Sequence, residues 1–176
     1  MKFTETELKG AYVIEMTKIK DSRGFFARGW SGPDFEEKGL NAKIAQVNVA
    51  WNEAKGTLRG MHFQYAPHGE VKLVRCTRGA LYDVMVDLRP TSPTRKQWFG
   101  LELTEDNYFM LYIPEGFAHG YQTLTDDAEI SYFTSALYTP YAAGGVRYDD
   151  PEFQIKWPLP VSRISDADGK WAPYRL

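Results

Sequence analysis

A histidine and an arginine interrupt the stretch GTLRGMHFQ (56–64), which otherwise has the composition of a buried strand. Histidine readily accepts a proton near neutral pH, so His62 is a candidate general base. Lys72 is a positive charge in the mostly apolar strand of EVKLVR, and burying it is costly unless it meets an anion such as a developing enolate. Tyr132, in ISYF, could supply a phenolic proton, although taken alone it is more typical of a core aromatic. Together these residues predict proton transfer next to a carbonyl group.

A metal site is a second kind of chemistry to consider, because His119 could act together with His62. His119 lies in PEGFAHGY (114–121), where proline and glycine mark a sharp turn into a strand. With His62 and Glu70 it would make a ligand set of two histidines and a carboxylate. Gln64 stands where a second histidine would complete an H-x-H pair, and its neutral carbonyl is a poor transition-metal ligand. We therefore favour chemistry without a metal or other cofactor.

Strand geometry only partly explains how Arg59 and His62 could act together. Side chains two residues apart in a strand share a face, so His62 and Gln64 should point the same way. Strict alternation sends Arg59 to the opposite face, unless a bulge at Gly60 changes its direction. The sequence alone leaves both arrangements open.

The composition indicates a folded protein with balanced charge. The chain has 176 residues, of which 43% are apolar and 15% aromatic, and we expect a single domain over residues 1–176. Its 21 basic and 23 acidic side chains nearly cancel, which argues against a nucleic-acid or membrane partner. The only cysteine, Cys76, excludes an internal disulfide framework. With no apolar leader or long apolar segment, the expected location is the cytoplasm.

Short segments rich in β-branched and aromatic residues dominate the chain, and turn residues separate them. Helix is scarce, with GPDFEEKGL (32–40) the best candidate. This pattern predicts an all-β antiparallel barrel or jelly roll. The expected strands, besides the opening stretch, are 11–19, 42–51, 71–77, 80–88, 99–104, 108–114 and 129–138.

The two glycine-rich segments that contain His62 and His119 resemble the two signatures of the cupin superfamily. Longer motifs then narrow the resemblance to one family. The chain resembles the dTDP-4-dehydrorhamnose 3,5-epimerase family from about residue 10 to 170. The resemblance implies a cupin jelly roll with a few short helices, no metal, and a homodimer with an exchanged N-terminal strand. It also implies inversion at C3 and C5 of a nucleotide-linked 4-keto-6-deoxyhexose. The motifs are DSRGFF (21–26), QVN (46–48), GTLRGMHFQ (56–64), KLVRCTRGALYDVMVDLRPTSPT (72–94), IPEGFAHGY (113–121), YDDP (148–151), IKWP (155–158) and SDAD (165–168).

The same resemblance assigns roles to individual residues. It implies His62 as the base with Asp168 as its carboxylate partner, Tyr132 as the acid on the other side of the sugar, and Lys72 as the main enolate stabiliser. Arg59 would lie near the 4-keto oxygen and His119 in the sugar pocket. The nucleotide diphosphate would meet Arg23, Gln46 and Asn48. The candidate substrate-binding residues are Arg23, Arg28, Gln46, Asn48, Arg59, His119 and Tyr138.

One position departs from the family pattern. Arg28 stands where the family usually has a glutamate beside thymine, and arginine cannot accept a hydrogen bond from the thymine N3 group. Arginine would suit the acceptors of cytosine, or it could turn to solvent or to a phosphate. The alternatives to a dTDP-sugar 3,5-epimerase are therefore an enzyme inverting one centre and an epimerase for a CDP- or GDP-linked sugar. A non-catalytic sugar-nucleotide-binding cupin is more distant.

Overall fold

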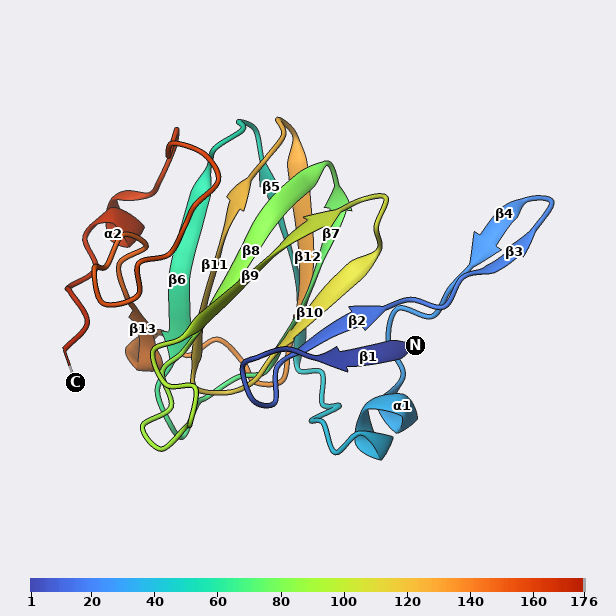
Figure 1. Cartoon of the computed structure of the whole chain (residues 1–176), viewed down its shortest axis with the longest axis horizontal. Coiled ribbons are helices and arrows are strands. Elements are labelled where there is room, and N and C mark those ends of the chain that lie inside the picture. The colour runs from blue at the N-terminus through green and yellow to red at the C-terminus, as the bar shows by residue number, and fades with distance from the viewer. Residues whose placement is uncertain (176) are drawn as a thin grey trace.

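In the computed structural model, which describes residues 1–175, antiparallel strands form the two facing sheets of a jelly roll (Figure 1). The all-β expectation is confirmed. In spatial order, the first sheet contains β1 (Lys2–Glu5), β2 (Tyr12–Glu15), β10 (Phe109–Ile113), β7 (Lys72–Arg78), β12 (Ala128–Thr134) and β5 (Gln46–Asn52). The second contains β13 (Ala143–Gly145), β6 (Leu58–Gln64), β11 (Phe117–Thr123), β8 (Ala80–Asp87) and β9 (Trp98–Thr104).

The core lies between the two sheets, because alternating side chains of each sheet point toward the other. Leu81, Met85, Leu111 and Ile130 are fully buried there. Smaller apolar clusters cover much of the two outer faces. Residues from the C-terminal third pack outside the second sheet, and the short helix α1 (Gly32–Glu37) packs outside the first.

The outer face of β5 is left uncovered. Val47, Val49 and Trp51 alternate on this edge strand, and their exposed fractions are 56%, 62% and 50%. Large apolar side chains gathered on one strand are typical of a surface that meets another protein.

A two-stranded hairpin projects away from the barrel (Figure 1). It consists of β3 (Ile19–Asp21) and β4 (Gly24–Phe26), and the backbone N–H of Arg23 donates to the Asp21 carboxylate at 2.8 Å to close its turn. Ile19 and Phe26 on this hairpin are 65% and 63% exposed. The expected strand 11–19 thus divides into β2, which pairs with β10, and β3, which leaves the barrel.

Several element boundaries differ from the expected ones. The expected strand 42–51 begins only at Gln46, and the expected strand 129–138 ends at Thr134, where the Thr134 hydroxyl donates to the Ala136 carbonyl at 2.9 Å. The helix expected over 32–40 is confirmed in its first part as α1. A second short helix, α2 (Asp166–Gly169), fits the few short helices that the resemblance implied, although its position was not predicted. Within residues 1–175, no helix is long and apolar enough to span a bilayer.

Candidate active site

A bulge in β6 brings Arg59 and His62 to the same face. His62 lies opposite His119 on β11, and Arg59 lies opposite Tyr121, so two residues of β6 between these pairs, Gly60 and Met61, match the single residue Gly120 of β11. Directly opposed residues of antiparallel strands share a face. Since His119 and Tyr121 both point into the barrel, Arg59 and His62 do so too.

Glycine is required at the centre of this bulge. Gly60 has a φ of 129°, and a Cβ there would lie 2.5 Å from the Cα of Gly120. A side chain would therefore separate the two strands. Of the two arrangements that the sequence left open, the structure contains the bulge.

His62 is paired with a buried carboxylate. Its Nε2 lies 2.6 Å from Oδ1 of Asp168, and the other oxygen of Asp168 accepts the backbone N–H of Gly60 at 3.1 Å. Burial by itself would raise the pKa of Asp168, but the hydrogen bonds from His62 and Gly60 more than offset it and leave this pKa below its ordinary value. Asp168 is therefore an anion at neutral pH, held so that it fixes the orientation of the imidazole.

The helix α2 delivers Asp168 to this pair. Ser165 caps its N-terminus, and the Ser165 hydroxyl accepts the backbone N–H of Asp168 at 3.1 Å. Asp168 is only 6% exposed, while the side chain of His62 is 46% exposed. One side of the imidazole is thus supported by the protein and the other is accessible.

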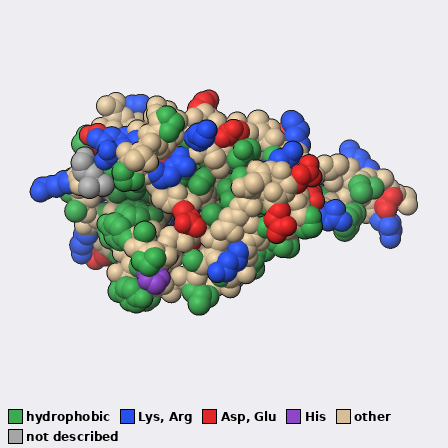
Figure 2. All heavy atoms as spheres, turned by 90° about the horizontal axis from the view of Figure 1, so that it is seen from below, with side chains coloured by type: hydrophobic (Ala, Val, Ile, Leu, Met, Phe, Trp, Pro, Cys, Tyr) green, Lys and Arg blue, Asp and Glu red, His purple; other side chains and the backbone are tan. Residues whose placement is uncertain are grey.

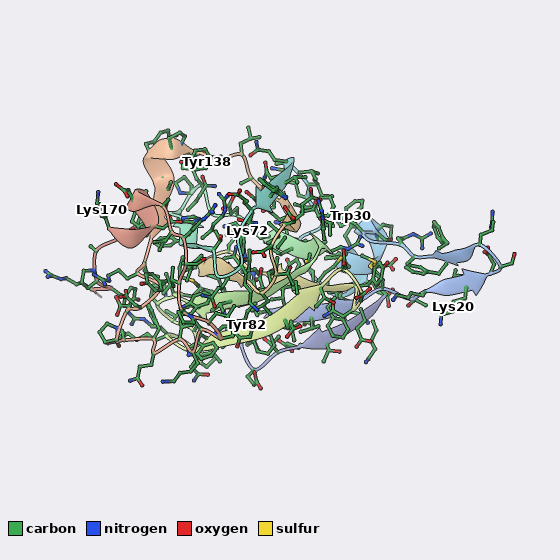
Figure 3. All side chains as sticks on the ribbon, turned by 90° about the horizontal axis from the view of Figure 1, so that it is seen from above. Lys20, Trp30, Lys72, Tyr82, Tyr138 and Lys170 are labelled. Atoms are coloured by element: carbon green, nitrogen blue, oxygen red, sulfur yellow. The ribbon has the colours of Figure 1, made fainter. Side chains whose placement is uncertain are left out.

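The first sheet contributes the opposite wall of the interior. Tyr132 on β12 lies opposite Asn48 on β5, and Thr134 lies opposite both Gln46 and Lys72. These positions are two residues apart along each strand, so they share the inward face, where Tyr132 packs against the core. Figure 3 shows Lys72 among the strands of the barrel. Four predicted site residues therefore meet on this wall.

Lys72 is buried together with a carboxylate. Its Nζ lies 2.9 Å from Oε1 of Glu70, and the two side chains are 10% and 12% exposed. The other Glu70 oxygen accepts from Nε2 of Gln64 at 3.3 Å. Burial raises the pKa of the Tyr132 phenol, and the Glu70 carboxylate raises it further, while Arg59 acts in the opposite direction. Tyr132 is therefore a protonated phenol at neutral pH.

A second histidine–carboxylate pair lies deeper in the barrel. Nε2 of His119 lies 2.9 Å from Oδ1 and 3.0 Å from Oδ2 of Asp83, which is fully buried. Nearby, Asn52 accepts hydrogen bonds from Nε of Arg59 at 2.8 Å and from the Tyr121 hydroxyl at 3.3 Å. Asn52 thus fixes the direction of the Arg59 guanidinium.

A cleft of about 510 Å³ opens beside His62 and Arg59. Its other lining residues include Trp51, Glu53, Arg163 and Asp168, and the guanidinium of Arg163 pairs with the Glu53 carboxylate. This volume is large enough for part of a sugar nucleotide.

Three predicted substrate-binding residues lie away from the interior of this chain. Arg23 is on the projecting hairpin with its side chain 87% exposed, and its guanidinium pairs with Asp21 at 2.6 Å. Arg28 is exposed just after the hairpin. Tyr138 is 65% exposed, but its backbone N–H donates to Oε1 of Gln46 at 2.9 Å, which places it beside the polar wall.

The candidate metal ligands each have a different partner. His62 pairs with Asp168, His119 with Asp83 and Glu70 with Lys72. Across residues 1–175, no group of three or more histidine, cysteine or acidic side chains is placed to hold a metal ion.

Sequence reasoning missed Asp83 and Asn52, and it considered Glu70 only as a metal ligand. Asp83 interrupts the apolar strand ALYDVMVD, as Lys72 interrupts its own strand, so the signal was present. The cleft residue Arg163 carried no such signal, because it comes from an irregular segment.

Together the two facing sheets and the polar interior define a cupin-type jelly roll. The model of one family in this class, described as dTDP-4-dehydrorhamnose 3,5-epimerase, matches residues 5–175. The chain therefore belongs to the dTDP-4-dehydrorhamnose 3,5-epimerase family, as its sequence motifs implied.

Individual relatives match nearly the whole chain. A dTDP-4-dehydrorhamnose 3,5-epimerase from Methanothermobacter thermautotrophicus is 40% identical, covering 99% of this chain and 95% of the relative. The crystal structure of the Bacillus anthracis dTDP-4-dehydrorhamnose 3,5-epimerase, with TDP and PPi bound, has a TM-score of 0.94 at 38% identity and covers 98% of this chain and 99% of its own. A dTDP-4-dehydrorhamnose 3-epimerase from Streptomyces niveus is 35% identical, covering 96% of this chain and 81% of the relative.

Proposed function

We propose that this enzyme inverts C3 and C5 of dTDP-4-dehydro-6-deoxy-D-glucose, giving dTDP-4-dehydro-L-rhamnose. The observation that carries the proposal is the His62–Asp168 pair at 2.6 Å, on a wall that faces Lys72 and Tyr132 across the barrel. A base and an acid on opposite sides of a sugar are what inversion of one carbon requires.

The reaction proceeds through an enolate. His62 removes the proton from the carbon next to the 4-keto group, and the electron pair of that C–H bond moves onto the ketone oxygen. The charges of Lys72 and Arg59 stabilise the resulting anion. Tyr132 then donates its phenolic proton to the opposite face of the same carbon, which inverts the centre. Asp168 stabilises the imidazolium formed on His62.

The relatives are named as dTDP-sugar epimerases, which favours a thymidine nucleotide, and the Bacillus anthracis structure holds TDP. Arg28 still favours a base with acceptor groups, so a CDP-linked sugar is the second candidate. The relative named as a 3-epimerase supports inversion at one centre as a further alternative. Because such substrates are soluble metabolites and Cys76 is a free thiol, we place the enzyme in the cytoplasm.

We also propose a homodimer in which the N-terminal segment crosses to the partner. In the single chain β2 pairs with β10, so the part available for exchange is the β3–β4 hairpin. Its exposed Ile19 and Phe26, together with the uncovered face of β5, are the surfaces that such a dimer would bury. The crossing would bring Arg23 to the partner's site.

The test is deuterium exchange in D2O, followed by NMR, with dTDP-, CDP- and GDP-linked 4-keto-6-deoxy sugars. We expect exchange and inversion at C3 and C5 of the dTDP sugar by the wild-type enzyme. His62→Ala should abolish both, while the matched control His68→Ala should retain them, because His68 contacts Thr139 and Tyr141 outside the interior. Exchange by His62→Ala at the wild-type rate would refute the assigned base.

A further inference from the structure

Gly145 on β13 is paired directly with His62 on β6. Directly opposed residues of antiparallel strands share a face, so a side chain at position 145 would stand beside the imidazole. A Cβ on Gly145 would lie 2.5 Å from Cδ2 and Nε1 of the Trp171 indole, and closer still to its Cε2. The space beside His62 that such a side chain would fill is therefore occupied by the indole of Trp171.

Glycine is not required at position 145 by the backbone. The φ of Gly145 lies outside the positive region that favours glycine, in contrast to that of Gly60. The three atoms nearest to an added Cβ all belong to the Trp171 indole. The indole is therefore what excludes a side chain here, and Gly145 provides the flat surface on which it packs.

The indole also contacts the imidazole of His62. The centroids of the two rings lie 6.4 Å apart and their planes meet at 70°, which is the edge-on arrangement common to paired aromatic rings. Trp171 follows Asp168 by three residues, so one short segment supplies both neighbours of the imidazole. Among residues 1–175, those that line the cleft include His62 and Asp168 but not Trp171. Trp171 thus supports the imidazole from outside the cleft.

The hydrogen bond to Asp168 restrains the imidazole incompletely. It engages Nε2, which leaves Nδ1 as the ring nitrogen that can accept a proton from a sugar. Nε2 lies nearer than Nδ1 to the line of the Cβ–Cγ bond, and rotation of a histidine ring about this bond is intrinsically soft. A modest rotation therefore displaces Nδ1 more than it displaces the hydrogen-bonded nitrogen.

We propose that Trp171 is a positioning residue that fixes the rotation of the His62 ring and so directs Nδ1 toward the substrate. The inference rests on the proposed function, in which His62 is the base. Nε1 of the indole is buried and has no hydrogen-bond partner within residues 1–175, so packing is what holds the indole against Gly145. A rigid ring in this place prevents the imidazole from turning.

The experiment measures the motion of the His62 ring directly, without substrate. Histidine labelled with 13C at Cδ2 is followed by NMR relaxation, and the His62 signal is assigned by its loss in His62→Ala. The Cδ2–H bond points across the Cβ–Cγ axis, so its order parameter reports rotation about that axis. In Trp171→Ala we expect the order parameter to fall from about 0.85, typical of a rigid group, to below about 0.6. Trp171→Phe keeps a flat ring on Gly145 and should remain near the wild-type value.

The catalytic consequence should be a loss of rate without a loss of binding. We expect exchange at C3 and C5 to slow by about tenfold or more in Trp171→Ala, because Nδ1 is no longer aligned with the C–H bond. KM should stay within about twofold of the wild-type value, since the lining of the cleft is unchanged. Trp98→Ala removes an indole from the outer cluster of the second sheet and should alter neither ring order nor rate. A tenfold loss of rate with wild-type ring order in Trp171→Ala would contradict the proposal.

A double-mutant cycle tests the pairing of Trp171 with Gly145. Gly145→Ala pushes the indole off its surface, so it should reproduce the loss of ring order seen in Trp171→Ala. Once Trp171 is alanine, the added Cβ no longer meets an indole, and Gly145→Ala should cause little further change. Wild-type ring order in Gly145→Ala, or independent effects that add in the double variant, would overturn the inference. Gly145→Ala also decides the matter if Trp171→Ala fails to fold.

The positioning role and the proposed function fail in different ways. An unchanged His62 order parameter in Trp171→Ala overturns the positioning role, whatever the enzyme does to sugars. Absence of exchange by the wild-type enzyme with every keto-sugar overturns the proposed function, and the relaxation measurement still decides whether Trp171 fixes the ring.

Discussion

At the scale of single residues, two buried aspartates illustrate how similar groups serve different purposes. Asp168 accepts from His62, which is accessible to a ligand. Asp87 is fully buried and accepts from Arg89 at 2.6 Å and from the hydroxyls of Ser92 and Thr94 at 2.5 and 2.7 Å. The motif DLRPTSPT (87–94) is therefore explained by the closure of a loop rather than by catalysis.

Removing the charge of Asp87 should weaken the fold at neutral pH. Burial would raise its pKa, but the donors around it hold the pKa below the ordinary 3.8. Its stabilisation is thus complete above that ordinary value and is lost as the pH falls through the lowered one. We expect Asp87→Asn to reduce the free energy of unfolding by about 3 kcal/mol at pH 7. Urea denaturation at pH 7 and in acid should show this difference shrinking with pH, and a difference that grows in acid would contradict the argument.

Replacing Tyr132 by phenylalanine should separate exchange from inversion. The ring and its packing remain, so His62 still removes a proton, but no acid stands on the other face. We expect solvent deuterium to enter the sugar with its configuration retained. The measurement is the ratio of exchange to inversion by NMR in D2O, and a ratio equal to that of the wild type would make Tyr132 a packing residue.

At the scale of elements, the proposed catalysis depends on α2, which has only one turn. Its cap at Ser165 holds the backbone of Asp168, so Ser165→Ala should free the carboxylate from its position. Loss of a cap costs about 1 kcal/mol, and we expect exchange to slow by about fivefold. Ser165→Thr restores a capping hydroxyl and should recover most of the rate. Equal rates in all three enzymes would show that Asp168 is held by other contacts.

Most of the barrel strands were predictable because segments rich in β-branched and aromatic residues are separated by turn residues. β7, β8, β9 and β10 lie within one or two residues of their expected bounds. The bulge at Gly60 could be suggested but not decided, since it depends on the approach of Gly120 from another strand. The helix α2 could not be predicted, because four residues carry no periodicity and Asp168 is stabilised mainly by tertiary contacts.

The assignments of single residues depended on the family resemblance more than on pattern. The residue types and their strand context were enough to propose His62, Lys72 and Tyr132. They gave no reason to join these residues to Asp168, which lies about a hundred positions from His62 in the chain. The pairing arises from the return of the C-terminal segment to β6, which local sequence does not encode.

At the scale of the whole molecule, the β3–β4 hairpin contacts the barrel through the ring of Phe25, which packs edge-on against Tyr108, while its Ile19 and Phe26 are exposed. It extends beyond the body of the protein in two views, and hydrophobic side chains are exposed on the body as well (Figures 1 and 2). An exposed two-stranded hairpin is marginally stable by itself, so its apolar side chains favour a contact with another subunit.

Mixed dimers offer a test of whether Arg23 completes the partner's site. Arg23→Ala and His62→Ala should each be nearly inactive as homodimers. When the two chains are co-expressed, each mixed dimer carries both changes in one site and none in the other, so we expect about a quarter of the wild-type activity. If Arg23 instead serves its own chain, every site contains one defect and no activity returns. Light scattering on the same samples reports whether dimers form.

The contact between Gly60 and Gly120 has a consequence for how this protein can evolve. A Cβ on Gly60 would meet the Cα of Gly120 at 2.5 Å, and a Cβ on Gly120 would meet the carbonyl oxygen of Arg59 at 2.7 Å. Either substitution forces the same two strands apart, so the second adds less than the first. The two glycines are therefore expected to be constrained together in evolution. A lineage that loses either glycine is released from keeping the other, and it loses the shared orientation of Arg59 and His62 in a single mutational step.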